Sequence, residues 1–232
     1  MSPPDRAMIL AAGFGTRMRP LSLARPKPLV AVAGRALIDR ALDRVAAAGL
    51  RRAVLNLHDR GEMIRAHLAG REAPALAFSE ERPEILDTGG GIAAALRQGL
   101  LGPAPFVAMN PDAIWTGPDP IAALMAAWEG AAADALLLLV PRARAESYGR
   151  PGDFFLEGDR PLRRGAAAAA PFVYTGVQIL APRAFEGVPE GAFSLNLVWD
   201  RLLAAGRLSA SVHRGGWVDV GTPEGVAVAE RA

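Results

Sequence analysis

The chain has 232 residues, of which 51% are hydrophobic and 22% charged, and its formal net charge is +2. This length and apolar content can build a sizeable core, which favours one domain over residues 1–232. The near balance of charge and the scattered arginines exclude an obvious nucleic-acid binder, and the absence of cysteine excludes disulfides, zinc–thiolate sites and thiol nucleophiles.

No stretch of the sequence indicates export or a membrane. The first six residues are polar, and the apolar run that follows ends at Gly13, which is too short for a signal peptide. No run approaches the roughly 20 apolar residues of a membrane span. We therefore expect a cytoplasmic protein that binds neither membranes nor nucleic acid.

The first 140 residues alternate between two hydrophobic periods. Short apolar runs predict strands, the first of them ended by glycine and typical of a strand buried on both faces; they lie at 7–12, 52–57, 76–79, 106–110 and 135–140. Stripes of helical period between them predict helices at 37–48, 61–68, 92–100 and 121–128. The alternation predicts an α/β fold, a Rossmann-like three-layer sandwich with a mostly parallel sheet and helices on both faces.

The regular alternation of strand and helix patterns ends after Pro141. Glycine and proline at 149–152 and 158–161 predict hairpins and loops, and the alanine tract 166–170 predicts a surface loop. A strand at 173–180, a helix at 195–203 and a final strand and loop at 217–222 follow. Active sites in such sheets lie beyond the carboxyl ends of the strands.

Lys27 is the only lysine, since arginine supplies every other one of the 26 Lys and Arg residues. It follows the turn Gly13-Phe14-Gly15, which comes directly after a predicted buried strand and can aim backbone N–H groups at anionic oxygens. A compact ammonium beside such a turn indicates a polyphosphate site. Met18 stands where a dinucleotide fingerprint needs its third glycine, and no Gly-Lys-Ser/Thr follows, so neither a nicotinamide fold nor a P-loop is supported.

Asp112 and Asp219 lie far apart in the chain, but Asp112 comes just after a predicted strand and Asp219 is in the Trp-x-Asp turn of the final strand and loop, and both should lie where strand ends converge. Two carboxylates, with phosphate oxygens and water, suit an octahedral Mg²⁺ ion. An aspartate at a strand end can also be a helix cap or a turn residue.

The string from Leu10 to Leu21, L-A-A-G-F-G-T-R-M-R-P-L, followed by R-P-K-P-L at 25–29, resembles the opening of the sugar-1-phosphate nucleotidylyltransferases. The resemblance continues through 86–91, 109–112, 174–176, 193–196 and 217–224. The compact length looks most like the N-acetylmuramate-1-phosphate uridylyltransferases of cell-wall recycling. The resemblance implies a nucleotidyltransferase fold of the glycosyltransferase-A type.

The resemblance implies Mg²⁺-dependent transfer of a nucleoside monophosphate, first of all UMP from UTP, to a sugar 1-phosphate, first of all N-acetylmuramate 1-phosphate, with release of pyrophosphate. Residues 1–115 would then mainly bind the nucleotide and residues 116–232 mainly the sugar phosphate. Because both reactants are anions and neither needs a protein nucleophile, positioning and charge neutralisation should do the catalysis.

The matching positions imply roles for individual residues. The expected catalytic residues are Arg17, Lys27 and Asp112. The expected nucleotide-binding residues are Leu10, Ala12, Gly13, Gly15, Thr16, Arg17, Lys27, Asp87, Gly89 and Gly90, with the three glycines 89–91 expected to form a flat loop surface for the base. The expected sugar-binding residues are Asn110, Tyr174, Thr175, Gly176 and Asn196, and the expected Mg²⁺ ligands are Asp112 and Asp219.

The chain departs from the family pattern at three places. Asp87 replaces the usual glutamate, and Pro111 removes a backbone N–H beside a metal ligand. Longer relatives bring a second lysine to the sugar phosphate, and this chain has none. Candidate replacements, for the phosphate or for the carboxylate of muramic acid, are Arg142, Arg144, Arg150 and Arg163.

Other functions stay open at this point. A mannose-1-phosphate guanylyltransferase or a phosphocholine cytidylyltransferase shares the opening motif, and three glycines leave few side chains to select a base. A non-catalytic nucleotide-sugar-sensing subunit is the alternative of another class. A metal-dependent glycosyltransferase is disfavoured because no Asp-x-Asp follows a predicted strand. The oligomeric state is left open.

Overall fold

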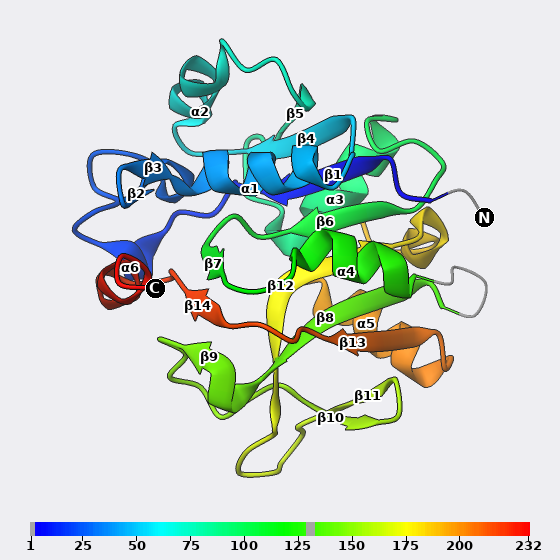
Figure 1. Cartoon of the computed structure of the whole chain (residues 1–232). Helices are drawn as coiled ribbons and strands as arrows, with labels where there is room; N and C mark the ends of the chain where they lie inside the picture. The colour runs from blue at the N-terminus through cyan, green and yellow to red at the C-terminus, as the bar shows by residue number, and fades with distance from the viewer. Residues whose placement is uncertain (1–2, 129–132) are drawn as a thin grey trace.

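The computed structural model describes residues 3–128 and 133–232, and within them nine strands form one large mixed sheet (Figure 1). The hydrogen-bonded path runs through β11 (Arg160–Arg163), β10 (Phe154–Glu157), β12 (Phe172–Leu180), β6 (Phe106–Met109), β1 (Arg6–Leu10), β4 (Arg52–Leu57) and β5 (Ala75–Glu80). Beside this path, β8 (Ala135–Pro141) pairs with β12 and with β13 (Leu208–Val212).

The expected α/β sandwich is confirmed, and its sheet has two different halves. The strands β6, β1, β4 and β5 are parallel to one another, as the alternating pattern predicts. β12 runs antiparallel to both β6 and β8, and this reversal makes the sheet mixed. The sequence could not reveal the reversal because a strand buried on both faces has the same apolar pattern in either direction.

Helices cover both faces of the sheet. One core contains apolar side chains from α1 (Leu37–Ala47), α2 (Gly61–Leu68) and α4 (Pro120–Ala127), and the other contains those from α3 (Asp87–Arg97) and α5 (Asn196–Ala204). Along β1, Ile9 enters the first core and Met8 the second, and both are fully buried. Each such side chain contributes about 1.5–3 kcal/mol on burial, which is why a central strand is apolar throughout.

The predicted bounds of the strand 52–57 and the helix 61–68 match β4 and α2. The expected helix at 92–100 is wrong at its start, because α3 begins at Asp87 and includes the three glycines 89–91. Glycine is a poor helix former, which favoured a loop. The helix forms there because its backbone packs tightly: a Cβ on Gly91 would lie 2.5 Å from Glu81 Oε1.

Several short elements were not predicted from the sequence, because two to seven residues are too few to show a clear hydrophobic period. They are the hairpin β2 (Ala31–Val32) and β3 (Arg35–Ala36), β7 (Ala113–Trp115), β9 (Ala145–Glu146), α6 (Pro223–Ala229) and the 3₁₀ turns η1 (Thr16–Met18), η2 (Lys27–Leu29), η3 (Arg142–Arg144) and η4 (Pro182–Phe185). β14 (Trp217–Asp219) lies between β7 and β9 in a separate small sheet. No helix of the described part is long and apolar enough to cross a bilayer.

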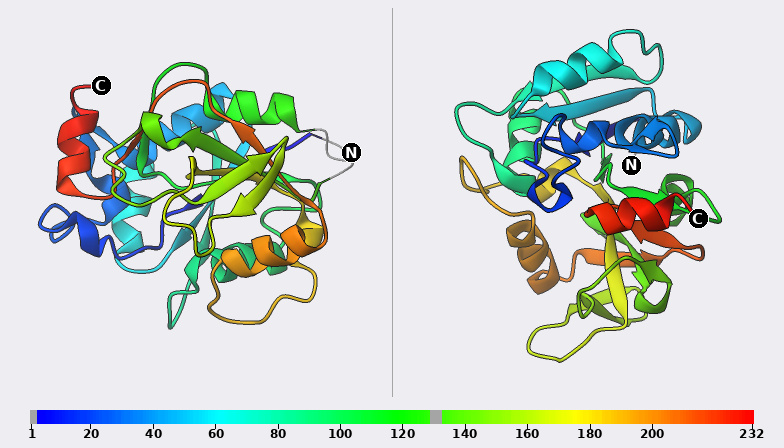
Figure 2. Two further views of the ribbon diagram at one scale, coloured as in Figure 1. Left: turned by 90° about the horizontal axis from the view of Figure 1, so that it is seen from below. Right: turned by 90° about the vertical axis from the view of Figure 1, so that its left-hand side faces the viewer.

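A third, smaller core joins the two ends of the chain. Met18 and Val30, which flank the lysine segment, pack with Val218, Val220 and other residues of β14 and α6. Figures 1 and 2 show α6 against the loops that follow β1. This cluster therefore holds the segment of Lys27 and the strand of Asp219 side by side.

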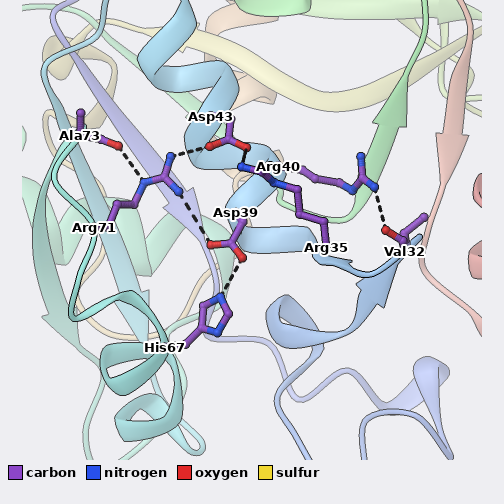
Figure 3. Close-up of polar contacts among 8 residues, drawn as sticks. All are labelled: Val32, Arg35, Asp39, Arg40, Asp43, His67, Arg71 and Ala73. Atoms are coloured by element: carbon purple, nitrogen blue, oxygen red, sulfur yellow. Dashed lines mark hydrogen bonds and ion pairs between the residues drawn. The ribbon is translucent and has the colours of Figure 1, made fainter.

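Polar contacts on the outer side of α1 brace the hairpin that follows Lys27 (Figure 3). Arg40 donates to the Val32 carbonyl at 2.7 Å, and Asp43 pairs with Arg35 and accepts from Arg71 at 2.8 Å. Exposed ion pairs contribute roughly 0–1 kcal/mol each, so the contacts orient the hairpin more than they stabilise the fold.

Candidate active site

Two adjoining cavities open at the carboxyl ends of β1 and β6, where the sheet topology predicts an active site. The first has a volume of about 270 Å³ and the second about 360 Å³. Both are lined by Leu10, Arg17, Asp87, Thr88, Asn110 and Asp112. Two ligands bound in these cavities would therefore meet at this shared wall.

The turn after β1 forms the floor of the first cavity, and its two glycines differ. Gly15 has φ +61°, and a Cβ on it would lie 2.7 Å from Lys27 Cβ, so the protein itself requires glycine there. Apart from Gly13 and its two neighbours in the chain, no atom of the described residues lies within 4 Å of the place where a Cβ on Gly13 would lie, although Gly13 lines the cavity. The absent side chain of Gly13 therefore leaves room for something other than protein.

Three charged side chains lie at or beside the shared wall, since Asp112 lines both cavities, Lys27 lines the first and Asp219 lines the second. Lys27 Nζ donates to Asp112 Oδ2, and both side chains are largely buried. Asp219 lies opposite Ala113 in the β7–β14 pairing, and the Val220 amide donates to the Asp112 carbonyl at 2.9 Å. The structure thus brings Lys27, Asp112 and Asp219 together, as the sequence analysis expects.

The pKa of Asp219 depends on these neighbouring charges and on burial. Burial, and then the negative charge of Asp112, raise the pKa of Asp219, while Lys27 and Arg17 act in the opposite direction. Two carboxylates held close in a partly buried site favour either a proton or a cation between them.

Arg17 lines both cavities and makes no hydrogen bond or ion pair with any described residue. A Cβ on Gly221 would lie 3.1 Å from Arg17 Nη1 and 2.8 Å from Asp219 Oδ1. Gly221 therefore lets the guanidinium lie beside the acidic pair with its donors unused.

A buried hydrogen-bond chain supports the inner end of the first cavity. The Ala11 amide donates to Asn56 Oδ1 at 2.7 Å, and Asn56 Nδ2 donates to Glu81 Oε1 at 2.7 Å. Glu81, which is fully buried, also accepts from the Leu86 amide at 2.7 Å. This chain ties the end of β1 to the loop that leads into α3.

The nucleotide-binding residues predicted from the sequence divide into two sets. Eight of them line the first cavity: Leu10, Ala12, Gly13, Gly15, Thr16, Arg17, Lys27 and Asp87. Gly89 and Gly90 are buried in α3 and line neither cavity. Their amides donate to the Phe193 carbonyl at 3.0 and 3.1 Å, and a Cβ on Gly89 would clash with the Phe193 ring. The expected open glycine surface is therefore covered by protein, and nucleotide contact by these two residues stays a prediction.

All five residues expected to bind the sugar line the second cavity: Asn110, Tyr174, Thr175, Gly176 and Asn196. Gly176 has φ +85° at a bulge of β12, and its carbonyl accepts from the Asn110 amide at 2.9 Å. Thr175 Oγ1 donates to the Leu138 carbonyl at 2.7 Å, so its hydroxyl is used inside the sheet.

Aromatic and amide side chains form one wall of the second cavity. Gln178, which is buried, donates to the Tyr174 hydroxyl at 2.8 Å and accepts from Trp199 Nε1 at 2.9 Å. Burial raises the pKa of Tyr174 far above its usual range, so the hydroxyl stays protonated and can donate. Gln178 thus links Tyr174 to Trp199 and orients both side chains in the wall.

Several cavity residues were missed by the sequence analysis. Asn56 and Gln178 each lie among apolar residues near the end of a buried strand, and a polar residue in such a run is the signal that could have found them. Asp153, which lines the second cavity and accepts from the Tyr174 amide at 2.9 Å, lies in a glycine-rich stretch with no such signal.

No group of three or more His, Cys, Asp or Glu side chains is gathered around a possible metal site in residues 3–128 and 133–232. The donor set at and beside the shared wall is the pair Asp112 and Asp219. Mg²⁺ is bound in many phosphate-transfer sites by one or two carboxylates, with water and substrate oxygens completing the octahedron. The two aspartates therefore fit a Mg²⁺ site of this kind, and they do not form an all-protein cage.

Comparison with protein-family models gives a match to the MobA-like NTP transferase domain over residues 7–188. The chain is 43% identical to an N-acetylmuramate alpha-1-phosphate uridylyltransferase of Caulobacter vibrioides, over 98% of this chain and 96% of that protein. It is 37% identical to the enzyme of that name from Neisseria meningitidis, over 94% and 93% of the two chains. A mannose-1-phosphate guanylyltransferase of Mycobacterium tuberculosis is 31% identical over 94% of this chain and 61% of its own length.

Solved structures give the same fold. A putative glucose-1-phosphate thymidylyltransferase from Bacillus anthracis superposes with a TM-score of 0.81 over 97% of this chain and 94% of its own, at 18% identity. A UDP-glucose pyrophosphorylase complexed with UDP-glucose superposes with a TM-score of 0.79 over 98% and 97% of the two chains, at 16% identity.

Proposed function

The chain belongs to the MobA-like NTP transferase family and, within it, to the family of the N-acetylmuramate alpha-1-phosphate uridylyltransferases, and we propose that it transfers UMP from UTP to N-acetylmuramate 1-phosphate. That it is a nucleotidyltransferase follows from the family. The observation that carries the proposal is the pair of adjoining cavities with Arg17 and Asp112 at their common wall and with Lys27 and Asp219 beside it. The choice of UTP and muramate rests on the two uridylyltransferase relatives.

In the proposal, the first cavity binds UTP. Backbone N–H groups of Gly13 to Thr16 face the triphosphate, and the space beside Gly13 admits a phosphate close to the backbone. Arg17 binds the outer phosphates with its unused fork. The base lies at the inner end, near Ala12 and Asp87, where the hydrogen-bond chain through Glu81 keeps the wall in place.

In the reaction, an oxygen of the sugar phosphate attacks the α-phosphorus, the new P–O bond forms, and the bond to the bridging oxygen of the β-phosphate breaks. Pyrophosphate leaves with the electron pair of that bond. Negative charge accumulates around the α-phosphate as this happens, and Lys27, oriented by Asp112, is the nearby cation that stabilises it. Bringing the reactants together in adjoining cavities removes much of the entropic barrier.

Mg²⁺ is the proposed cofactor, and Asp112 and Asp219 are the residues that would hold it. When bound, it would neutralise phosphate charge and fix the phosphate oxygens. Burial, and then the charge of Asp112, raise the pKa of Asp219, and this supports the assignment because a bound divalent cation would offset the same unfavourable negative charge that a proton offsets. Pro111, between Asn110 and Asp112, contributes no N–H to this wall.

The second cavity is proposed to bind N-acetylmuramate 1-phosphate. Asn110, Tyr174 and Asn196 offer amide and hydroxyl groups to sugar hydroxyls, and Thr175 and Gly176 offer backbone. Residues 1–115 then supply most of the nucleotide site and residues 116–232 most of the sugar site. A cytoplasmic location, where nucleoside triphosphates are available, belongs to the same proposal.

The test is a mass-spectrometric screen of UTP, CTP, GTP and dTTP against N-acetylmuramate 1-phosphate, N-acetylglucosamine 1-phosphate, mannose 1-phosphate and phosphocholine. The expected main product is UDP-N-acetylmuramate, formed with pyrophosphate and lost when EDTA removes divalent cations. A preference for GDP-mannose or CDP-choline would replace the proposed substrates. Nucleotide-sugar binding without any turnover would indicate a sensing subunit.

A further inference from the structure

The second cavity contains a cation to which no role has yet been given. Arg150 lines this cavity, and its guanidinium makes no hydrogen bond or ion pair with any residue of 3–128 or 133–232. We propose that Arg150 binds the phosphate group of the sugar phosphate and so takes the place of the second lysine that this chain lacks. This inference rests on the proposed function and names the residue that binds the reacting end of the acceptor.

The guanidinium of Arg150 is held in place without using its donors. Its Cζ lies 4.7 Å from the centroid of the Tyr148 ring. Tyr148 is fixed in turn, because its hydroxyl donates to Asp153 Oδ1 at 3.0 Å and its ring lies edge-on to Trp217, with centroids 6.1 Å apart. A stacked guanidinium keeps its N–H groups free in the ring plane, which is the geometry for a bidentate contact with phosphate.

The backbone around Arg150 is anchored on both sides. β9 ends just before it and pairs with β14, with Glu146 opposite Val218, so this loop starts beside the strand of Asp219. After it, the Ala170 amide donates to the Pro151 carbonyl at 2.8 Å. Arg150 and Asp219 line the same cavity. The β9–β14 pairing therefore brings the loop of Arg150 to the strand of Asp219, on the side of the cavity where the acceptor phosphate must meet UTP.

The other arginines of this region are less suitable. Arg142 and Arg144 line neither main cavity, and Arg144 donates to the Arg214 carbonyl at 2.6 Å. Arg163 lines the second cavity, but it donates to Asp200 at 2.7 Å and to Asn196 at 2.9 Å. Its charge is therefore already compensated.

Arg163 also lies against a different part of the cavity wall from Asp112 and Asp219. Its guanidinium is over the rings of Phe154 and Trp199, at 5.2 Å from each centroid. Arg17, the remaining cation of the second cavity, also lines the first cavity and is assigned to the triphosphate. Arg150 is thus the cation of the second cavity left for the acceptor phosphate.

The test begins with Arg150→Ala. Loss of a charge-assisted, bidentate contact should raise KM for N-acetylmuramate 1-phosphate about 10- to 100-fold. KM for UTP should change less than about twofold, because the contact is not made to the nucleotide. Arg150→Lys should recover part of the loss, since it keeps the charge without the fork. A KM for the sugar phosphate equal to that of the wild type would overturn the assignment.

Arg144→Ala is the matched control. Arg144 lies in the same segment and is also exposed, but its guanidinium contacts the Arg214 backbone outside the cavity. This variant should keep both KM values. Both substitutions are at exposed positions, so thermal melting should show that each variant is folded.

Two competing ligands separate phosphate recognition from recognition of the muramate carboxylate. N-acetylglucosamine 1-phosphate has the phosphate and no carboxylate, whereas N-acetylmuramate has the carboxylate and no phosphate. Arg150→Ala should weaken binding of the first by the same factor as the KM change and leave binding of the second unchanged. The reverse pattern would reassign Arg150 to the carboxylate.

Calorimetry keeps this test independent of turnover. Binding of N-acetylglucosamine 1-phosphate to the wild type and to Arg150→Ala is measured with and without a non-hydrolysable UTP analogue. A wild type that binds the ligand but makes no UDP-N-acetylmuramate contradicts the proposed function alone. Equal affinity of the two proteins, or no binding by the wild type, contradicts the role of Arg150.

Discussion

The two cavities are built in different ways. The wall of the first comes largely from small residues at the end of β1 and in the turn after it and from Lys27 and Pro28, and its charged side chains are Arg17, Lys27, Glu81, Asp87 and Asp112. The second is walled by side chains from β10, β11, β12, α5 and β14. The first therefore suits a ligand recognised by its charge, and the second suits a ligand recognised by its shape and hydroxyls. Substitutions of the charged residues between the two cavities should lower turnover. Substitutions of side chains in the wall of the second cavity should raise KM for the sugar phosphate.

The largest effect is expected at Lys27. Lys27→Ala removes the cation beside the reacting phosphate and should lower turnover by about 10²- to 10³-fold, comparable to the loss of one preorganised donor. Arg25→Ala is the matched control, because Arg25 is exposed two residues earlier and lines neither main cavity. Steady-state kinetics of both variants measure whether turnover falls only in Lys27→Ala. Turnover by Lys27→Ala close to that of the control would remove Lys27 from the mechanism.

Asp219→Asn should lower turnover by a similar factor, about 10²-fold or more, if the residue holds the metal ion. Metal dependence gives a second readout. Mg²⁺ should raise the melting temperature of the wild type and have little effect on the variant. An equal Mg²⁺ shift in both proteins would place the ion elsewhere.

The raised pKa of Asp219 also predicts a pH effect on stability. The folded state keeps this proton to a higher pH than the unfolded state, so the free energy of unfolding falls as pH rises from the ordinary carboxyl range through the raised pKa. Asp219→Asn cannot lose a proton and should lack this decline. Urea unfolding in EDTA from about pH 4 to about pH 8 compares the two proteins. Parallel pH profiles would contradict the role given to burial and Asp112.

The next effect is expected at Gly13 and Gly15, the two glycines of the turn after β1. Gly13→Ala adds a methyl group where the protein has open space, so it should leave stability nearly unchanged and raise KM for UTP by about 10- to 100-fold. Gly15→Ala has to adopt φ +61° and should cost about 1–2 kcal/mol of stability. Chemical denaturation and KM measurements on both variants test the contrast. If Gly13→Ala binds UTP normally, the nucleotide does not approach this turn.

Gly90→Ala tests the packing role of the glycines in α3. A Cβ there would clash with the Gly191 carbonyl oxygen, and such overpacking costs about 1–3 kcal/mol. We expect lower stability, with the order of preference among the four nucleotides unchanged. A changed base preference at normal stability would instead favour the glycine surface expected from the sequence.

The smallest effect is expected at Thr175. Thr175→Val loses the hydrogen bond to the Leu138 carbonyl and should cost about 1 kcal/mol of stability. KM for the sugar phosphate should change less than about twofold, because this hydroxyl is already used inside the sheet. A large change in KM would show that the hydroxyl binds the sugar.

The difference between the cavities also explains what the sequence could predict. Gly13, Arg17 and Lys27 are close in the chain, and the parallel order of β1 and β6 brings Asp112 to the same edge, so the pattern pointed to all four. The glycines of α3 were placed in a loop because their tight packing against the segment of Phe193 has no trace in local propensity.

The second cavity could be predicted only in part. Tyr174, Thr175 and Gly176 were found through the family resemblance, and Arg150 was one of four candidate arginines. Choosing among the four required the reversal of β12, the hairpin β10–β11 and the β9–β14 pairing. These contacts join distant segments, and sequence spacing does not encode which side chains then share a cavity.

The central claim is that a sugar phosphate in the second cavity attacks the α-phosphorus of a nucleotide in the first. Mass spectrometry of the reaction between UTP and N-acetylmuramate 1-phosphate labelled with oxygen-18 in its phosphate tests this directly. The label should be retained in UDP-N-acetylmuramate, and the released pyrophosphate should be unlabelled. Label in the pyrophosphate, or no nucleotide sugar from any labelled sugar phosphate, would contradict it.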